Sequence, residues 1–196
     1  ASLLNDSIRV LCRNMDVAQA IAGKSTIVFT DHRRRSKTKL YRINNSRGDE
    51  QRHPFYLELI RVARETVKEA QGIVPVLKSY ESGDFFLGLK IAAICGELEA
   101  YIPLAEKVVS QAYRRIVNKE KVPSSEKIVS IFEAHTDIIA KGNRQFVFGH
   151  KVMLTTGVSG LLFKLRVLDG NPKDSNLVPE NLSDLQSLHG KAPTAL

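Results

Sequence analysis

The chain has 196 residues, of which 43% are hydrophobic and 26% are charged, a composition typical of a globular protein. Its longest apolar runs are far too short to cross a bilayer, and its first residues lack the basic and apolar regions of a secretory signal. We therefore expect no membrane association and a cytoplasmic location. The formal net charge of +8 favours a polyanionic partner, because each phosphate that a cation neutralises releases counterions.

Three segments space their apolar residues by three and four positions, which is typical of amphipathic helices. They cover residues 4–22, 56–77 and 84–118. Pro75 and Pro103 are expected to kink the second and third helices, because proline cannot donate a backbone hydrogen bond. The three helices can bury their apolar faces against one another in a bundle or a hairpin.

Residues 30–52 are rich in basic side chains and poor in apolar ones, which indicates a polar linker or a polar helix and turn. We expect part of this segment to contact DNA phosphates. The predicted contacts are Arg33, Arg34, Arg35, Lys37 and Lys39. The alternative is a solvated surface with no ligand, which is the usual role of a run of charges.

Beyond these helices the apolar period changes to two. Residues 146–154 alternate as in a strand, residues 161–168 are rich in β-forming side chains, and a glycine-containing turn at 157–160 joins them as a hairpin. A short helix over 179–188 and the start of another strand at 192–196 follow. The unpaired edge of such a hairpin predicts self-association as a homo-oligomer. Three further cations flank its first strand and are also predicted to contact DNA: Lys141, Arg144 and Lys151.

Three aspartates invite a catalytic interpretation, because paired carboxylates can hold divalent metals for phosphoryl transfer. They are Asp137, Asp169 and Asp174. We favour structural roles instead. Asp169 lies in an Asp-Gly-Asn-Pro turn, where its side chain would cap its own backbone, and Asp174 resembles a helix cap. His135 and His150 have no second ligand at a spacing that would build a metal site. The residues alone therefore predict no catalytic group, no metal site and no resident cofactor.

Two cysteines, Cys12 and Cys95, lie in apolar, helix-like surroundings, where we expect reduced core thiols rather than a disulfide.

The sequence contains several long motifs. The most specific are Ser-Ile-Phe-Glu-Ala-His-Thr-Asp-Ile-Ile at 130–139, Phe-Gly-His-Lys-Val at 148–152 and Val-Leu-Asp-Gly-Asn-Pro-Lys-Asp-Ser at 167–175. These motifs resemble bacterial DDE insertion-sequence transposases of the ISNCY type. Residues 3–11 and 101–123 are similar to further segments of the same family. The resemblance therefore extends over nearly the whole chain.

The resemblance implies a ribonuclease-H-like core in which three carboxylates bind divalent metal, usually Mg²⁺, for DNA strand cleavage and transfer during transposition. It places the first family carboxylate before Ala1 and the other two after Leu196, so that no catalytic residue of the family matches a position in this chain. We therefore expect an internal fragment of a transposase that binds DNA at element ends and is inactive alone. Whether the chain counts as an enzyme is thus left open.

The combined prediction is an α/β (α+β) fold. Residues 1–122 would form a helical insertion that contains the basic linker 30–52, and residues 123–196 would form a partial ribonuclease-H-like core. Two alternatives remain: a non-enzymatic, basic helical module for DNA binding or protein interaction, and a small metal-dependent nuclease that uses Asp137, Asp169 and Asp174.

Overall fold

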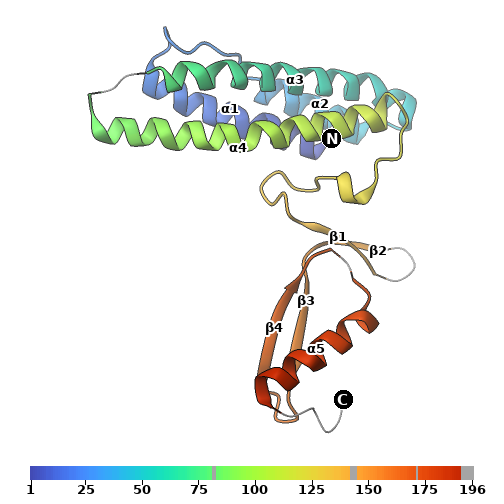
Figure 1. The fold of residues 1–196 in the computed structure, drawn as a ribbon. Coiled ribbons are helices and arrows are strands. Elements are labelled where there is room, and N and C mark those ends of the chain that lie inside the picture. Colours follow the sequence, from blue (N-terminus) through green and yellow to red (C-terminus); the bar gives the residue numbers. More distant parts are fainter. Residues whose placement is uncertain (81–82, 142–144, 171, 191–196) are drawn as a thin grey trace. The chain divides into compact units, whose positions relative to one another are not determined.

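The protein is described here by a computed structural model, which covers residues 1–80, 83–141, 145–170 and 172–190 (Figure 1). The chain divides into two compact units, Ala1–Ala134 and His135–Leu196, called here the helical unit and the strand unit. It contains both helices and small antiparallel sheets, so the broad α+β class predicted from the sequence is confirmed. None of the described helices combines the length and the apolar character that crossing a bilayer requires.

Four helices form the helical unit: α1 (Ser2–Ala22), α2 (Arg33–Asn45), α3 (Asp49–Lys78) and α4 (Phe85–Ile116). The long helices α1, α3 and α4 each pack against the other two, and α2 lies against α1 and α3 (Figure 1). The apolar faces predicted from the helical spacing supply the core. Its fully buried members include Leu4, Leu11, Met15, Leu59, Leu77 and Leu98.

Helix α1 ends at Gly23, whose positive φ of 90° suits a residue without a Cβ atom. The Gly23 N–H donates to the carbonyl of Gln19 at 2.9 Å. The side-chain amide of Gln19 in turn donates to the carbonyl of Ile27 at 2.8 Å, and Ile27 is buried. One glutamine thus fixes the chain where it turns from α1 towards α2.

Helix α3 continues through Pro54 and Pro75, and helix α4 continues through Pro103, each as a single element. Pro75 lies in the last turn of α3, and its carbonyl accepts the N–H of Ser79 at 3.0 Å at the helix end. Helix α4 begins where the sequence predicts, because the Asp84 carboxylate accepts the N–H groups of Phe86 at 2.8 Å and Leu87 at 3.4 Å.

Of the two alternatives for residues 30–52, the polar linker is wrong and the polar helix and turn is confirmed, since most of this segment forms α2 and the first turn of α3. Tertiary contacts explain the difference. Ile43 is buried against the core, and the buried Ser36 hydroxyl donates to the Asn5 side-chain oxygen of α1 at 2.5 Å. A helix with few apolar residues is held in this way by neighbours that its own sequence does not reveal.

The segment that follows α4 packs onto the helical unit. The side-chain amide of Gln111 makes two hydrogen bonds with the backbone of Ile128. It accepts the Ile128 N–H at 3.0 Å and donates to the Ile128 carbonyl at 2.9 Å. Ile128 and Ile131 are buried in the core, after a short 3-10 helix over Ser124–Glu126. Residues 123–134, which the sequence analysis grouped with the strands, therefore belong to the helical unit.

The described residues of the strand unit form two two-stranded antiparallel sheets. One pairs β1 (Asp137–Lys141) with β2 (Gln145–Gly149), and the other pairs β3 (Lys151–Thr156) with β4 (Leu162–Leu168). The predicted hairpin around the turn at 157–160 is confirmed, with Val152 opposite Val167 and Leu154 opposite Leu165.

The prediction of one continuous strand over 146–154 is wrong. Gly149 has φ of 152°, a value that side chains with a Cβ atom rarely adopt, and His150 lies outside both strands. The alternation simply resumes in β3, so the pattern could not reveal the break. The strand predicted at 192–196 lies outside the described residues.

The last helix, α5 (Asp174–His189), contacts the polar side of the β3–β4 hairpin. Lys164 pairs with Asp184, Arg166 lies 2.5 Å from Glu180, and the Asn181 amide donates to the Thr155 hydroxyl at 3.0 Å. The apolar side chains at the alternate positions of the hairpin are about half exposed. We call them the exposed hairpin face: Val152, Leu154, Leu165 and Val167.

Candidate nucleic-acid interface

Helix α2 carries all five cations of the first predicted DNA-binding cluster, but three of them are already paired inside the protein. Arg33 lies 2.6 Å from Asp16 of α1 and 2.7 Å from Asp31. The hydrogen bond with Asp31 raises the pKa of the Arg33 guanidinium, and the same bond lowers the pKa of the Asp31 carboxyl. Arg33 therefore fastens α2 to the end of α1.

Arg35 and Lys39 pair with the opposite neighbour, α3. Arg35 lies 3.3 Å from Glu58 and 3.6 Å from Glu65, and the Lys39 ammonium lies 2.5 Å from Glu58. The Lys39 side chain is only 14% exposed, so its charge is satisfied within the fold. The hydrogen bond with Lys39, followed by that with Arg35, lowers the pKa of the Glu58 carboxyl.

The remaining two cations, Arg34 and Lys37, are exposed and make no ion pair with any part of the chain that the structure describes. Successive helical residues turn by about 100°, so positions 34, 37 and 41 share one side of α2. Tyr41 is 69% exposed. These three residues define the outer face of α2: two cations without partners beside one aromatic ring.

In the second predicted cluster, Lys151 is the cation whose side chain the structure describes, and it is already paired. Lys151 donates to the carbonyl of Pro172 at 2.6 Å and lies 2.5 Å from Asp174, so it holds the loop before α5. Arg144 lies outside the described residues. For Lys141, only the backbone at the end of β1 is described.

Two of the candidate carboxylates, Asp137 and Asp174, make contacts within the strand unit. The Asp137 side chain accepts the backbone N–H of Gly170 at 2.9 Å, which links the start of β1 to the turn after β4. Asp174 is the first residue of α5 rather than its cap; the cap position is Lys173, and no side-chain cap hydrogen bond forms there. The predicted cap role of Asp174 is therefore wrong, and its charge pairs with Lys151 instead.

The two histidines do come together, which their separation in sequence does not reveal. The rings of His135 and His150 stack nearly parallel with their centroids 4.9 Å apart, and His150 Nδ1 lies 3.7 Å from the Asp137 carboxylate. Among the described residues, no group of three or more histidine, cysteine, aspartate or glutamate side chains is placed to share a metal ion.

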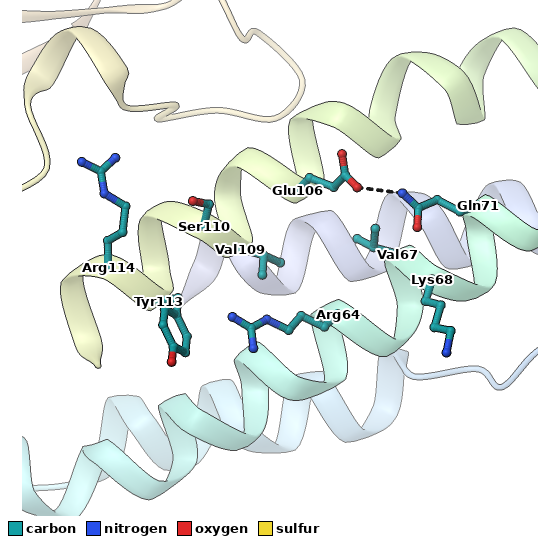
Figure 2. Close-up of a pocket in the computed structure, with 9 residues that line it drawn as sticks. All are labelled: Arg64, Val67, Lys68, Gln71, Glu106, Val109, Ser110, Tyr113 and Arg114. Atoms are coloured by element: carbon teal, nitrogen blue, oxygen red, sulfur yellow. Dashed lines mark hydrogen bonds between the residues drawn. The ribbon is translucent and has the colours of Figure 1, made fainter. Parts of the chain in front are cut away.

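Sequence reasoning missed a second basic site on the helical unit. A groove of about 320 Å³ lies between α3 and α4, lined in part by Arg64, Lys68, Ser110 and Tyr113 (Figure 2). Its cations come from separate turns of amphipathic helices, so no dense charge run marks them. The available signal was the four-residue spacing of Arg64 and Lys68, which puts both on one side of α3.

Comparison of the chain with protein-family models, with curated protein sequences and with solved structures finds no match.

Proposed function

We propose that the helical unit binds the phosphate backbone of duplex DNA through the outer face of α2. The observation that carries this proposal is the exposure of Arg34 and Lys37, which have no carboxylate partner among the described residues. Three other cations of α2, Arg33, Arg35 and Lys39, are paired with carboxylates, and Arg42 lies over the ring of Phe55. Unpaired cations can contact phosphates without first breaking an ion pair inside the protein, and they release the counterions of the DNA. Such contacts position a duplex without reading its sequence.

We further propose that the chain is part of a DNA transposase. The support is the resemblance of the motifs at 130–139, 148–152 and 167–175 to the insertion-sequence family. In this proposal the helical unit is an insertion that contacts DNA, and the strand unit contributes to a ribonuclease-H-like core. Two of the candidate aspartates have structural roles in this proposal, which the contacts of Asp137 with Gly170 and of Asp174 with Lys151 support.

A non-enzymatic DNA-binding module remains the second candidate function. The observation that favours it is the separate core of the helical unit, which gathers the buried apolar residues of all four of its helices. Both candidates use the outer face of α2, so the same binding experiment tests this shared step.

The experiment measures duplex affinity by fluorescence anisotropy over a series of salt concentrations. We expect the double variant Arg34→Ala/Lys37→Ala to weaken binding of any duplex by roughly tenfold near 0.1 M salt, and to flatten the salt slope by about 2. The matched control is Lys90→Ala/Lys107→Ala, which removes two charges from α4 that are also exposed. Equal affinity and equal salt slope in the two double variants would refute the proposed interface.

A further inference from the structure

The groove between α3 and α4 brings together several hydrogen-bond donors for which the described residues supply no acceptor. In Figure 2, the Arg64 side chain extends from α3 towards the ring of Tyr113 on α4, and its guanidinium lies 4.5 Å from the ring centroid. Arg64 has no carboxylate partner within the described part of the chain. The ring therefore fixes the position of the guanidinium while leaving its N–H groups available.

Two neighbouring arginines, Arg61 and Arg114, differ from Arg64 because carboxylates contact them. Arg114, which also lines the groove, pairs with Glu120 and lies 2.7 Å from Glu126, so its charge is neutralised. Arg61, one turn before Arg64 on α3, lies 3.7 Å from Glu65. Unlike Arg61 and Arg114, Arg64 therefore keeps its donors available for a ligand.

The rest of the groove suits an anion with several oxygen atoms. Lys68 lies one turn along α3 from Arg64, and the hydroxyl groups of Ser110 and Tyr113 make no hydrogen bond with the described residues. The donors come from two helices. Together they can therefore bind an anion with more oxygen atoms than the two of a carboxylate. Val67 and Val109 add apolar surface beneath them.

One acid also lines the groove, and it limits where an anion can lie. The Glu106 carboxylate accepts a hydrogen bond from the Gln71 amide at 2.7 Å, and this pair lies at the opposite end from Tyr113 (Figure 2). Repulsion by Glu106 would hold an anion near Arg64 and Tyr113.

We propose that this groove binds the phosphate group of a nucleotide, held by the Arg64 guanidinium with Lys68, Ser110 and Tyr113 as further donors. A planar guanidinium matches two phosphate oxygens at once, which a carboxylate-paired arginine could not offer. The volume of about 320 Å³ is at the lower end of the range for small-molecule sites and accommodates a nucleotide-sized group. The phosphate can belong to a free nucleotide or to a nucleic-acid strand, and this site is distinct from the outer face of α2.

The test uses the full chain and three probes: inorganic phosphate, adenosine monophosphate and a short duplex DNA. Calorimetry measures the affinity for the first two, and fluorescence anisotropy measures the affinity for the duplex. We expect Arg64→Gln to weaken binding of at least one nucleotide-bearing probe by tenfold or more, since one charged, bidentate contact is lost. The control Arg61→Gln removes the same charge one turn away and should change affinity less than twofold.

The three probes separate the two sources of phosphate. A loss for adenosine monophosphate alone assigns the groove to a free nucleotide, whereas a loss for the duplex alone assigns it to a strand. The Arg34→Ala/Lys37→Ala variant should leave the affinity for adenosine monophosphate unchanged. The proposed DNA interface on α2 and the proposed groove site can therefore fail independently, and the two failures give different results.

Lys68→Gln and Ser110→Ala serve as independent variants if Arg64→Gln does not fold, as checked by its circular dichroism. Each should weaken the same probe severalfold. The inference is overturned if the parent chain binds none of the three probes. It is also overturned if the groove variants and Arg61→Gln bind all three alike.

Discussion

The helical unit and the strand unit differ in how far their apolar side chains are buried. In the helical unit, apolar residues from all four helices form one buried cluster, and its charged residues fasten α2 from outside. In the strand unit, α5 contacts the hairpin through charged and polar pairs, while the exposed hairpin face points to solvent. Because apolar burial dominates folding free energy, we expect the helical unit to provide most of the stability of the chain.

The largest expected effect is that of a core truncation. Leu98 of α4 is fully buried, whereas Leu165 of β4 is 58% exposed. We expect Leu98→Ala to lower the free energy of unfolding of the helical unit by about 2–5 kcal/mol, because it leaves a cavity. Leu165→Ala should cost under about 1 kcal/mol. Urea denaturation followed by circular dichroism measures both, and equal losses would contradict the contrast between the units.

The cysteine thiols provide a local probe of the helical unit. Both are free and buried, as the sequence predicts, and burial raises the pKa of Cys12 from 9.0 to about 11. A raised pKa leaves less reactive thiolate at pH 8, by roughly a hundredfold. We expect both thiols to resist a thiol reagent until the helical unit unfolds, even in urea that melts the strand unit. Rapid labelling of the native chain would show that the helical core opens readily.

The exposed hairpin face should promote self-association, as the unpaired hairpin edge already suggests from the sequence. Leu154→Lys places a charge in this face, and we expect it to raise the concentration at which the chain associates by about tenfold, equivalent to about 1.4 kcal/mol. Leu57→Lys is the control, because Leu57 is also exposed but lies on α3. Sedimentation or light scattering measures the change. Association that both substitutions weaken equally would place the contact elsewhere.

The smallest expected effect distinguishes the charges that fasten α2 from those that fasten α5. Glu58→Gln should lower the stability of the helical unit by about 1 kcal/mol, because it leaves the little-exposed Lys39 without its partner. Glu180→Gln removes a more exposed pair and should cost less than about 0.5 kcal/mol. Thermal melts of both variants check this order.

The Glu58 pair also predicts a dependence on pH. The pKa of Glu58 is lowered in the folded state, so its contribution is complete above the ordinary value of 4.5 and disappears as the pH falls through the lower, folded-state pKa. The parent chain should therefore lose more stability than Glu58→Gln when the pH is lowered from 5 to 3. Parallel losses in the two proteins would show that Glu58 contributes nothing to this acid sensitivity.

Local patterns in the sequence determined much of the fold. The three amphipathic helices and the hairpin with its glycine turn follow from apolar spacing and turn chemistry, which act between near neighbours. The reduced, buried cysteines follow from their apolar surroundings. The break at Gly149 was not predictable in this way, because the same alternation continues on both sides of it.

Tertiary structure decided which charges remain available. The sequence presents Arg33, Arg34 and Arg35 as three equal cations, yet Asp16 neutralises the first and Glu58 and Glu65 neutralise the third. Likewise, nothing near Arg64 in the sequence indicates that Tyr113 will hold its guanidinium across a groove. A run of charges in the sequence shows where cations lie along the chain. Whether those cations are available for a ligand depends on carboxylates and aromatic rings that only folding brings near them.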